Sequence, residues 1–156
     1  MKTSSAFWFA LLLFTAPAVL VAEVLGAGEP LPAMELPDQH GNAHALADAA
    51  VIVFAPDKAA SEIAHPVLEA RTDQLQARGI VYVTDISAMP GFVTRMFALP
   101  KMRDYGYTVL LGREAGDTGV LPRQEGRVTV LRIAGQRVGA IRFAESAQAL
   151  AELLDD

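Results

Sequence analysis

After residue 22, two short segments stand out in the hydrophobic pattern: the continuous apolar run over residues 51–55 and the similar segment 80–84, which ends in Thr84. Runs of this length without polar interruption are typical of strands buried on both faces of a sheet. Between them, apolar residues recur at helical spacing and predict a helix over residues 57–78. Pro66 is expected to kink this helix, because the periodicity continues past it, and Gly79 to end it. The pattern predicts a βαβ unit with parallel strands and a right-handed crossover.

The second half of the chain has a different order of elements. Residues 90–105 are predicted to be helical in part, with a break at Pro100. Residues 107–111 are predicted to form a third strand, and residues 127–143 have the alternation and central turn of a β-hairpin. Ser146 can cap a closing helix. The predicted order is therefore βαβ, a middle segment and then ββα.

Residues 1–22 have the pattern of a secretion signal, with a lysine followed by a long apolar run. Ala22 is the expected cleavage point, and Ala18 and Ala27 are competitors. Pro17 fits a signal peptide better than a membrane-spanning helix. The expected location is the periplasm, and contact with a membrane is expected only if the segment stays uncleaved as an anchor.

The remaining chain is expected to consist of an extended lead-in, residues 23–37, and one domain, residues 38–156. The chain contains no cysteine, so its stability cannot come from disulfides. Its formal net charge of −5 argues against nucleic acid as a partner, because phosphates require a basic surface.

The order of elements resembles the thioredoxin motif. Residues 51–68 look like the strand, active-site loop and first helix of that family, and its helix-kinking proline matches Pro66. On this alignment Lys58 and Ser61 occupy the positions of the two redox cysteines. The resemblance implies an α/β fold: a thioredoxin-like three-layer sandwich with a mixed β-sheet flanked by helices.

The later segments are similar to peroxiredoxins and to YtfJ-like periplasmic proteins. The similarity covers residues 85–91 and the strand, connector and hairpin over residues 107–135. Arg127 stands where peroxiredoxins carry an arginine that supports their reactive thiolate. The proline that thioredoxins keep in cis is missing directly before Val128, and Pro122 is the nearest proline. The resemblance thus implies the scaffold without its thiol chemistry.

Thiol–disulfide exchange and peroxidase activity are not expected, because both need a thiolate. A lysine cannot exchange disulfides, and a serine needs a neighbouring base before it can attack. Asp57, Asp85 and Arg127 could form a polar cleft at the carboxyl ends of the parallel strands, where open α/β sheets place ligands. The simpler interpretation is a helix cap at Asp57 and a strand-end turn at Asp85.

No metal or cofactor is predicted. His40 and His44 have the spacing of a helical metal pair, but a glycine and an asparagine between them disfavour a helix. His65 falls on the polar side of its helix and is expected at the surface. Neither a nucleotide-binding glycine motif nor a hydrolase elbow is present in the sequence.

One segment, residues 89–107, is a candidate surface for a protein partner. It contains methionines interleaved with aromatic residues, which adapt to partners, and it carries a basic rim. The basic residues are Arg95, Lys101 and Arg103. The alternative is a helix that covers the sheet and turns its basic face to water.

These features favour an exported binding or accessory module that has lost redox activity. The alternative is a non-thiol enzyme that uses the polar cleft at the start of the kinked helix. A third hypothesis is a structural protein that forms oligomers through an edge strand of its sheet.

Overall fold

The computed structural model describes residues 23–156, and the predicted secretion signal at residues 1–22 lies outside the described residues. In chain order, the elements are β1 (Glu35–Pro37), β2 (Ala43–Ala45), the 3₁₀-helix η1 (Leu46–Asp48), β3 (Val51–Ala55), α1 (Lys58–Glu69), α2 (Thr72–Leu75), β4 (Ile80–Asp85), α3 (Gly91–Val93), the π-helix η2 (Thr94–Ala98), α4 (Leu99–Arg103), β5 (Val109–Gly112), β6 (Val128–Ala134), β7 (Arg137–Ala144) and α5 (Ala147–Asp155). Five strands form one mixed sheet in the order β5-β4-β3-β6-β7, with β1 and β2 as a separate pair.

The predicted βαβ unit is confirmed, since β3 and β4 pair in parallel on either side of α1. Every residue of β3 is buried, as its continuous apolar run predicted. Helix α1 begins after Asp57, whose carboxylate accepts a hydrogen bond from the backbone N–H of Ala60. Pro66 lies inside α1, which continues for three more residues to Glu69.

The helix predicted to run to residue 78 is shorter than expected. Arg71 leaves helical geometry with φ −119° and ψ 14°, and the chain resumes a helix only in the four-residue α2. The guanidinium of Arg71 is bonded to Asp155 at the end of α5, 2.9 Å away. Apolar spacing indicates only which residues face the sheet, and Leu75 still faces it from α2. The spacing therefore did not reveal that the helix is interrupted at Arg71.

The predicted hairpin and closing helix are confirmed. Strands β6 and β7 pair antiparallel around a two-residue turn in which Gly135 and Gln136 both have positive φ, as a tight hairpin turn requires. The hydroxyl of Ser146 then caps α5 by accepting a hydrogen bond from the backbone N–H of Ala149.

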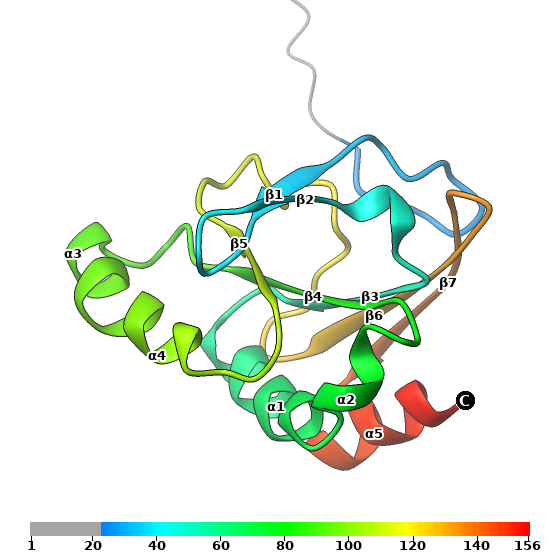
Figure 1. Cartoon of the computed structure of the whole chain (residues 1–156). Coiled ribbons are helices and arrows are strands. Elements are labelled where there is room, and N and C mark those ends of the chain that lie inside the picture. Colours follow the sequence, from blue (N-terminus) through cyan, green and yellow to red (C-terminus); the bar gives the residue numbers. More distant parts are fainter. Residues whose placement is uncertain (1–22) are drawn as a thin grey trace, which may run out of the picture.

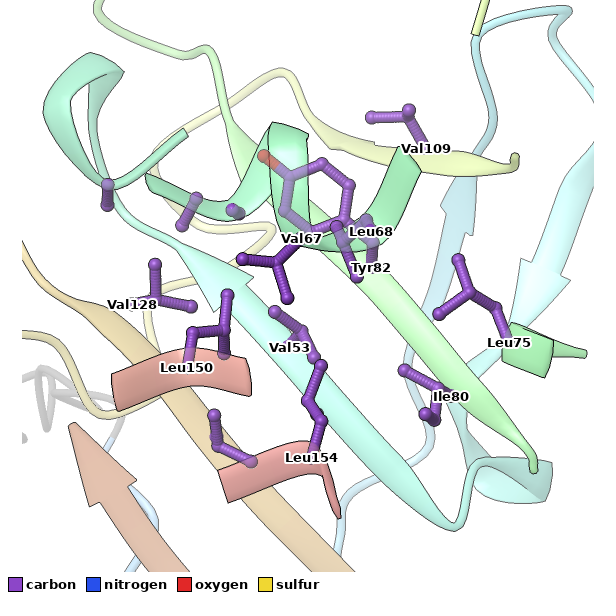
Figure 2. Packing of buried hydrophobic residues seen from close by; sticks show 14 of the residues in the cluster. Val53, Val67, Leu68, Leu75, Ile80, Tyr82, Val109, Val128, Leu150 and Leu154 are labelled. Atoms are coloured by element: carbon purple, nitrogen blue, oxygen red, sulfur yellow. The ribbon is translucent and has the colours of Figure 1, made fainter. Parts of the chain in front are cut away.

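Two hydrophobic clusters cover the two faces of the sheet. Figure 2 shows the first, in which Val67 and Leu68 of α1 and Leu150 and Leu154 of α5 surround Val53. The second cluster lies on the other face and includes Leu25 and the β1–β2 region. In Figure 1, α1, α2 and α5 lie below the sheet and the β1–β2 pair lies above it. The sheet is thus the middle layer of a sandwich.

The predicted helix over residues 90–105 is present, but its break at Pro100 is not. Elements α3, η2 and α4 follow one another without interruption from residue 91 to residue 103. The backbone N–H of Leu99 bonds to the carbonyl of Thr94, five residues earlier. This π turn directly precedes Pro100 and absorbs the distortion that its missing N–H would otherwise cause. We call residues 91–103 the helical arm; it extends to the left of the body in Figure 1.

A search of residues 23–156 for a helix with the length and hydropathy needed to cross a bilayer finds none.

Candidate binding cleft at the start of helix α1

A cleft of about 350 Å³ opens where β3 and β4 end. Its lining residues are Pro56, Asp57, Lys58, Asp85, Ile86, Ser87, Ala88, Met89 and Arg123. Because the carboxyl ends of neighbouring parallel strands meet at one edge of the sheet, Asp57 and Asp85 both reach this cleft. The structure thus brings together two of the three residues that the sequence suggested for a polar cleft.

Both carboxylate oxygens of Asp57 have backbone donors. Oδ1 accepts a hydrogen bond from Ala60 in the first turn of α1, at 2.9 Å. Oδ2 accepts one from the N–H of Gly126, at 2.7 Å, in the connector that precedes β6. The negative charge of Asp57 therefore occupies the positive end of the helix, the place at which a thioredoxin would stabilise its thiolate.

Both carboxylate oxygens of Asp85 also accept hydrogen bonds, and its side chain is 6% exposed. One oxygen accepts hydrogen bonds from the backbone and hydroxyl of Ser87, and the other accepts from Thr118 and Arg123. Burial alone would raise the pKa of Asp85, but these hydrogen bonds outweigh burial and hold the pKa below its ordinary value of 3.8. A carboxylate of this kind is a weak proton acceptor, which makes Asp85 unsuitable as a general base.

Lys58 and Ser61, which the resemblance to thioredoxins aligns with the redox cysteines, lie in different environments. The Lys58 side chain is 88% exposed, and its ammonium lies 3.5 Å from Glu62 one turn away. Ser61 points toward the sheet, where its hydroxyl lies 3.0 Å from both the carbonyl of Asp57 and the hydroxyl of buried Thr84. Ser61 is therefore a helix-start serine whose hydrogen bonds are made within the fold, without a base to activate it.

Arg127 lies outside the set of residues that line the cleft, and Arg123 stands there instead. Arg127 pairs with Glu145 on the surface, at 3.1 Å. Arg123 bonds Asp85 at 3.0 Å and the carbonyl of Thr118 at 2.7 Å, and its guanidinium lies 5.3 Å from the ring centroid of Phe54. Sequence reasoning missed Arg123, although a cation in the connector was required to neutralise Asp85 at the strand end.

The charges of Asp57 and Asp85 are thus balanced within the protein, the exposed Lys58 lies next to Glu62, and most of the remaining lining is apolar. Asp85 is neutralised by Arg123, and Asp57 is held by the helix start and Gly126. Ile86, Ala88 and Met89 provide the apolar lining. Such a cleft is suited to receive an apolar group, because its polar atoms already have partners.

A second cavity, of about 340 Å³, lies near the other end of β4. It is lined by residues from β2, α2, β4 and β5, among them His44 and Leu75, and by Tyr107 in the segment before β5. None of the groups suggested for chemistry by the sequence, Asp57, Lys58, Ser61, Asp85 and Arg127, contributes to its lining.

His65, which its helical position predicted at the surface, is only partly exposed. Its Nδ1 lies 2.7 Å from the hydroxyl of Tyr107, and its ring stacks on Tyr105 with centroids 4.2 Å apart. Burial raises the pKa of Tyr107, so its hydroxyl stays protonated and shares this hydrogen bond with His65. The helical wheel of α1 could not show that His65 is covered by Tyr105, because Tyr105 comes from the chain segment that follows the helical arm.

The two remaining histidines flank a turn organised by Asp38. The Asp38 carboxylate accepts hydrogen bonds from the backbone of His40 and Asn42 and lies 2.9 Å from Nε2 of His44. Burial works against its ionisation, but these bonds outweigh burial and depress the pKa of Asp38. The next residue, Gln39, is buried and bonds the backbone on both sides of Thr108. These contacts anchor the β1–β2 turn against the edge of the sheet.

A scan of the sequence against protein-family models finds no match, and a search of curated proteins finds no significant match. Solved structures are similar in fold. The thioredoxin domain of a thiol-disulfide oxidoreductase from Bacteroides vulgatus superposes with a TM-score of 0.56 at 13% identity, over 84% of this chain and 96% of that chain. Peroxidoxin BcpB from Mycobacterium tuberculosis gives a TM-score of 0.53 at 17% identity, over 84% and 95%. A peroxiredoxin-like protein from Aquifex aeolicus gives 0.54 at 11% identity, over 86% and 89%.

The chain therefore has the thioredoxin-like fold, and the fold class predicted from the sequence is confirmed. It has this fold without a cysteine anywhere in its 156 residues, so it lacks the redox cysteines of the proteins with which the fold is shared.

Proposed function

We propose that this protein is an exported, thioredoxin-like binding or accessory module with no thiol redox activity of its own. The observation that carries the proposal is the cleft at the start of α1. The resemblance to thioredoxins places a redox site here, Asp57, Asp85 and Arg123 are bonded within the fold, and most of the remaining lining is apolar. Export, with the periplasm as destination, is supported by the pattern of residues 1–22.

The ligand proposed for the cleft is an apolar side chain presented by a protein partner. Met89 lines the cleft and is the first residue of the segment 89–107, so a partner that fills the cleft also contacts the start of that segment. Because the charges of Asp57, Asp85 and Arg123 are already compensated, this contact should depend little on salt.

The alternative, a non-thiol enzyme in the same cleft, has less support. Both oxygens of Asp57 and of Asp85 already accept hydrogen bonds within the fold, the pKa of Asp85 is lowered, and Ser61 faces away toward Thr84. No observation in the cleft favours a particular reaction.

Site-specific photo-crosslinking in cells tests the proposal. A photo-reactive amino acid replaces Ala88, which is exposed and lines the cleft, and the matched control replaces exposed Gln148 on α5. A discrete crosslinked protein from position 88 alone is expected, and Met89→Glu should weaken this product by placing a charge in the apolar cleft. Identical products from both positions, or none from position 88, would contradict the proposal.

A further inference from the structure

The outer side of the helical arm exposes three large apolar side chains within six residues. Phe92, Met96 and Phe97 are 62%, 68% and 65% exposed. Within residues 23–156, Val24 is the one other large apolar residue exposed to a similar degree. Leu99 and Met102, in the last part of the arm, are partly buried and pack against the hydrophobic core, so this end of the arm is attached to the body.

The π turn affects how Phe92 and Phe97 are arranged around the arm. In an α-helix, residues five apart point in widely different directions, whereas a π turn contains about one residue more than an α turn. Phe92 and Phe97 are five residues apart, and η2 spans Thr94–Ala98 between and around them. The local geometry therefore brings the two rings closer to a common face than an α-helix would.

The charge of the arm is opposite to that of the protein. Residues 91–103 contain Arg95, Lys101 and Arg103 and no acidic residue, whereas the whole chain has a net charge of −5. Within the described part of the chain, none of these three cations forms an ion pair. Arg103 donates to the carbonyl of Gln39, which leaves Arg95 and Lys101 facing solvent beside the apolar residues.

The arm extends outward from the body in Figure 1, and neither cavity described above is lined by any of its residues. A protein partner would need a preformed groove to receive the arm, whereas a fluid bilayer adapts to it. Exposed phenylalanines flanked by basic residues are the composition of helices that lie in a membrane interface.

We propose that the helical arm docks on a bilayer that contains anionic phospholipid. Phe92, Met96 and Phe97 enter the interface, and Arg95 and Lys101 contact the anionic headgroups. The acidic remainder of the molecule is repelled by the same headgroups, so the charge distribution orients the protein with its arm toward the membrane. The cleft at α1 lies outside this surface, and the docking is independent of the function proposed for the cleft.

A tryptophan reporter at the docking surface tests this proposal. The only tryptophan of the chain is Trp8, in residues 1–22. The full coding sequence with Trp8→Phe and Phe97→Trp is expressed, and the exported protein is mixed with phosphatidylcholine vesicles with and without phosphatidylglycerol. With phosphatidylglycerol, the emission should shift to shorter wavelength, and brominated acyl chains should quench it. A control chain with Trp8→Phe and Gln148→Trp places the indole on exposed α5 and should be quenched far less.

Matched variants separate the apolar and electrostatic contributions in vesicle co-sedimentation. Phe92→Ser with Phe97→Ser should abolish binding, and Arg95→Gln with Lys101→Gln should weaken it about fivefold for each cation removed. Arg113→Gln with Arg142→Gln removes the same charge at exposed sites outside the arm and should leave affinity close to that of the unmodified protein. Circular dichroism verifies that each variant is folded.

Three results would overturn the proposal. The first is an indole at position 97 that stays in water with every vesicle composition. The second is equal quenching at positions 97 and 148, which would place the membrane contact elsewhere. The third is burial of the indole in the absence of vesicles. If sedimentation then shows a dimer, the arm is an interface between copies of the chain. If a non-lipid ligand buries the indole instead, the arm is a protein-binding surface.

Discussion

The carboxylate of Asp57, at the start of α1, accepts a hydrogen bond of 2.7 Å from the backbone N–H of Gly126, 69 residues further along the chain. The same carboxylate caps the helix through Ala60. One side chain thus joins the helix start to the connector that carries Arg123 across the strand ends. This contact helps to position both sides of the cleft.

Replacing Asp57 with alanine should lower the free energy of unfolding by about 2 kcal/mol. The loss of the helix cap contributes about 1 kcal/mol, and the unpaired N–H of Gly126 contributes about as much again. Denaturant-induced unfolding measures the change. Ser146→Ala is the matched control, because Ser146 also caps a helix through its side chain but holds no second segment, and its loss should be about 1 kcal/mol. Equal losses in the two variants would show that the Gly126 bond contributes nothing.

The bonds to Asp85 predict a stability that depends on acid pH. Because its pKa lies below the ordinary value of 3.8 in the folded protein, Asp85 contributes stability above about pH 4. This contribution is lost as the pH falls through the folded-state pKa. Asp85→Asn should destabilise the protein by about 1 to 3 kcal/mol at neutral pH, since it leaves the Arg123 charge without its counterion. The variant should also lose less stability on acidification than the unmodified chain does.

Unfolding free energies measured from pH 7 down to acid conditions test this prediction. Asp73→Asn, at an exposed site on α2, is the control and should follow the unmodified protein throughout. Asp38 has a depressed pKa as well, so some acid sensitivity should remain in the Asp85 variant. A variant whose pH profile runs parallel to that of the unmodified protein would contradict the role given to Asp85.

The sequence predicted those parts of the fold that depend on local patterns. Strands β3 and β4, the β6–β7 hairpin and the capped helix α5 are set by continuous apolar runs, a Gly-containing turn and a capping serine, all of which can be recognised within a few residues. Asp57 and Asp85 could also be placed together, because both follow parallel strands.

The rest depends on contacts between distant segments. Which arginine enters the cleft, Arg123 or Arg127, is decided by the path of an irregular connector that has no periodicity to predict it. The cover over His65 comes from Tyr105 and Tyr107, about forty residues further on. The π turn before Pro100 likewise lacks a recognisable sequence pattern, and only the structure shows that the helix continues through it.

The hydrogen bond between His65 and Tyr107 predicts that Tyr107→Phe lowers the free energy of unfolding by about 1 kcal/mol. The ring and its packing against Tyr82 and Tyr105 remain, so the change isolates the hydroxyl. Thermal unfolding measures the effect. Tyr105→Phe is the comparison, because the stacking of Tyr105 on His65 does not require its hydroxyl. If Tyr105→Phe cost as much as Tyr107→Phe, the effect could not be assigned to the bond with His65.

Restoring the two thiols should recover only weak redox activity. Lys58→Cys with Ser61→Cys recreates the spacing of the thioredoxin motif in the first turn of α1. The adjacent Asp57 carboxylate already occupies the positive helix end and opposes a second anion there, so the thiol at position 58 should be less acidic than in a working oxidoreductase. Adding Asp57→Asn should lower the pKa of that thiol by about 1 and raise the rate of disulfide reduction severalfold. Thiolate absorbance as a function of pH and an insulin-reduction assay measure the two quantities.

Glu62→Gln in the same background is the control for this prediction. It removes an exposed carboxylate one turn away and should change the thiol pKa and the reduction rate only slightly. An unchanged thiol pKa after Asp57→Asn would contradict the conclusion that the negative charge of Asp57 acts at the start of α1.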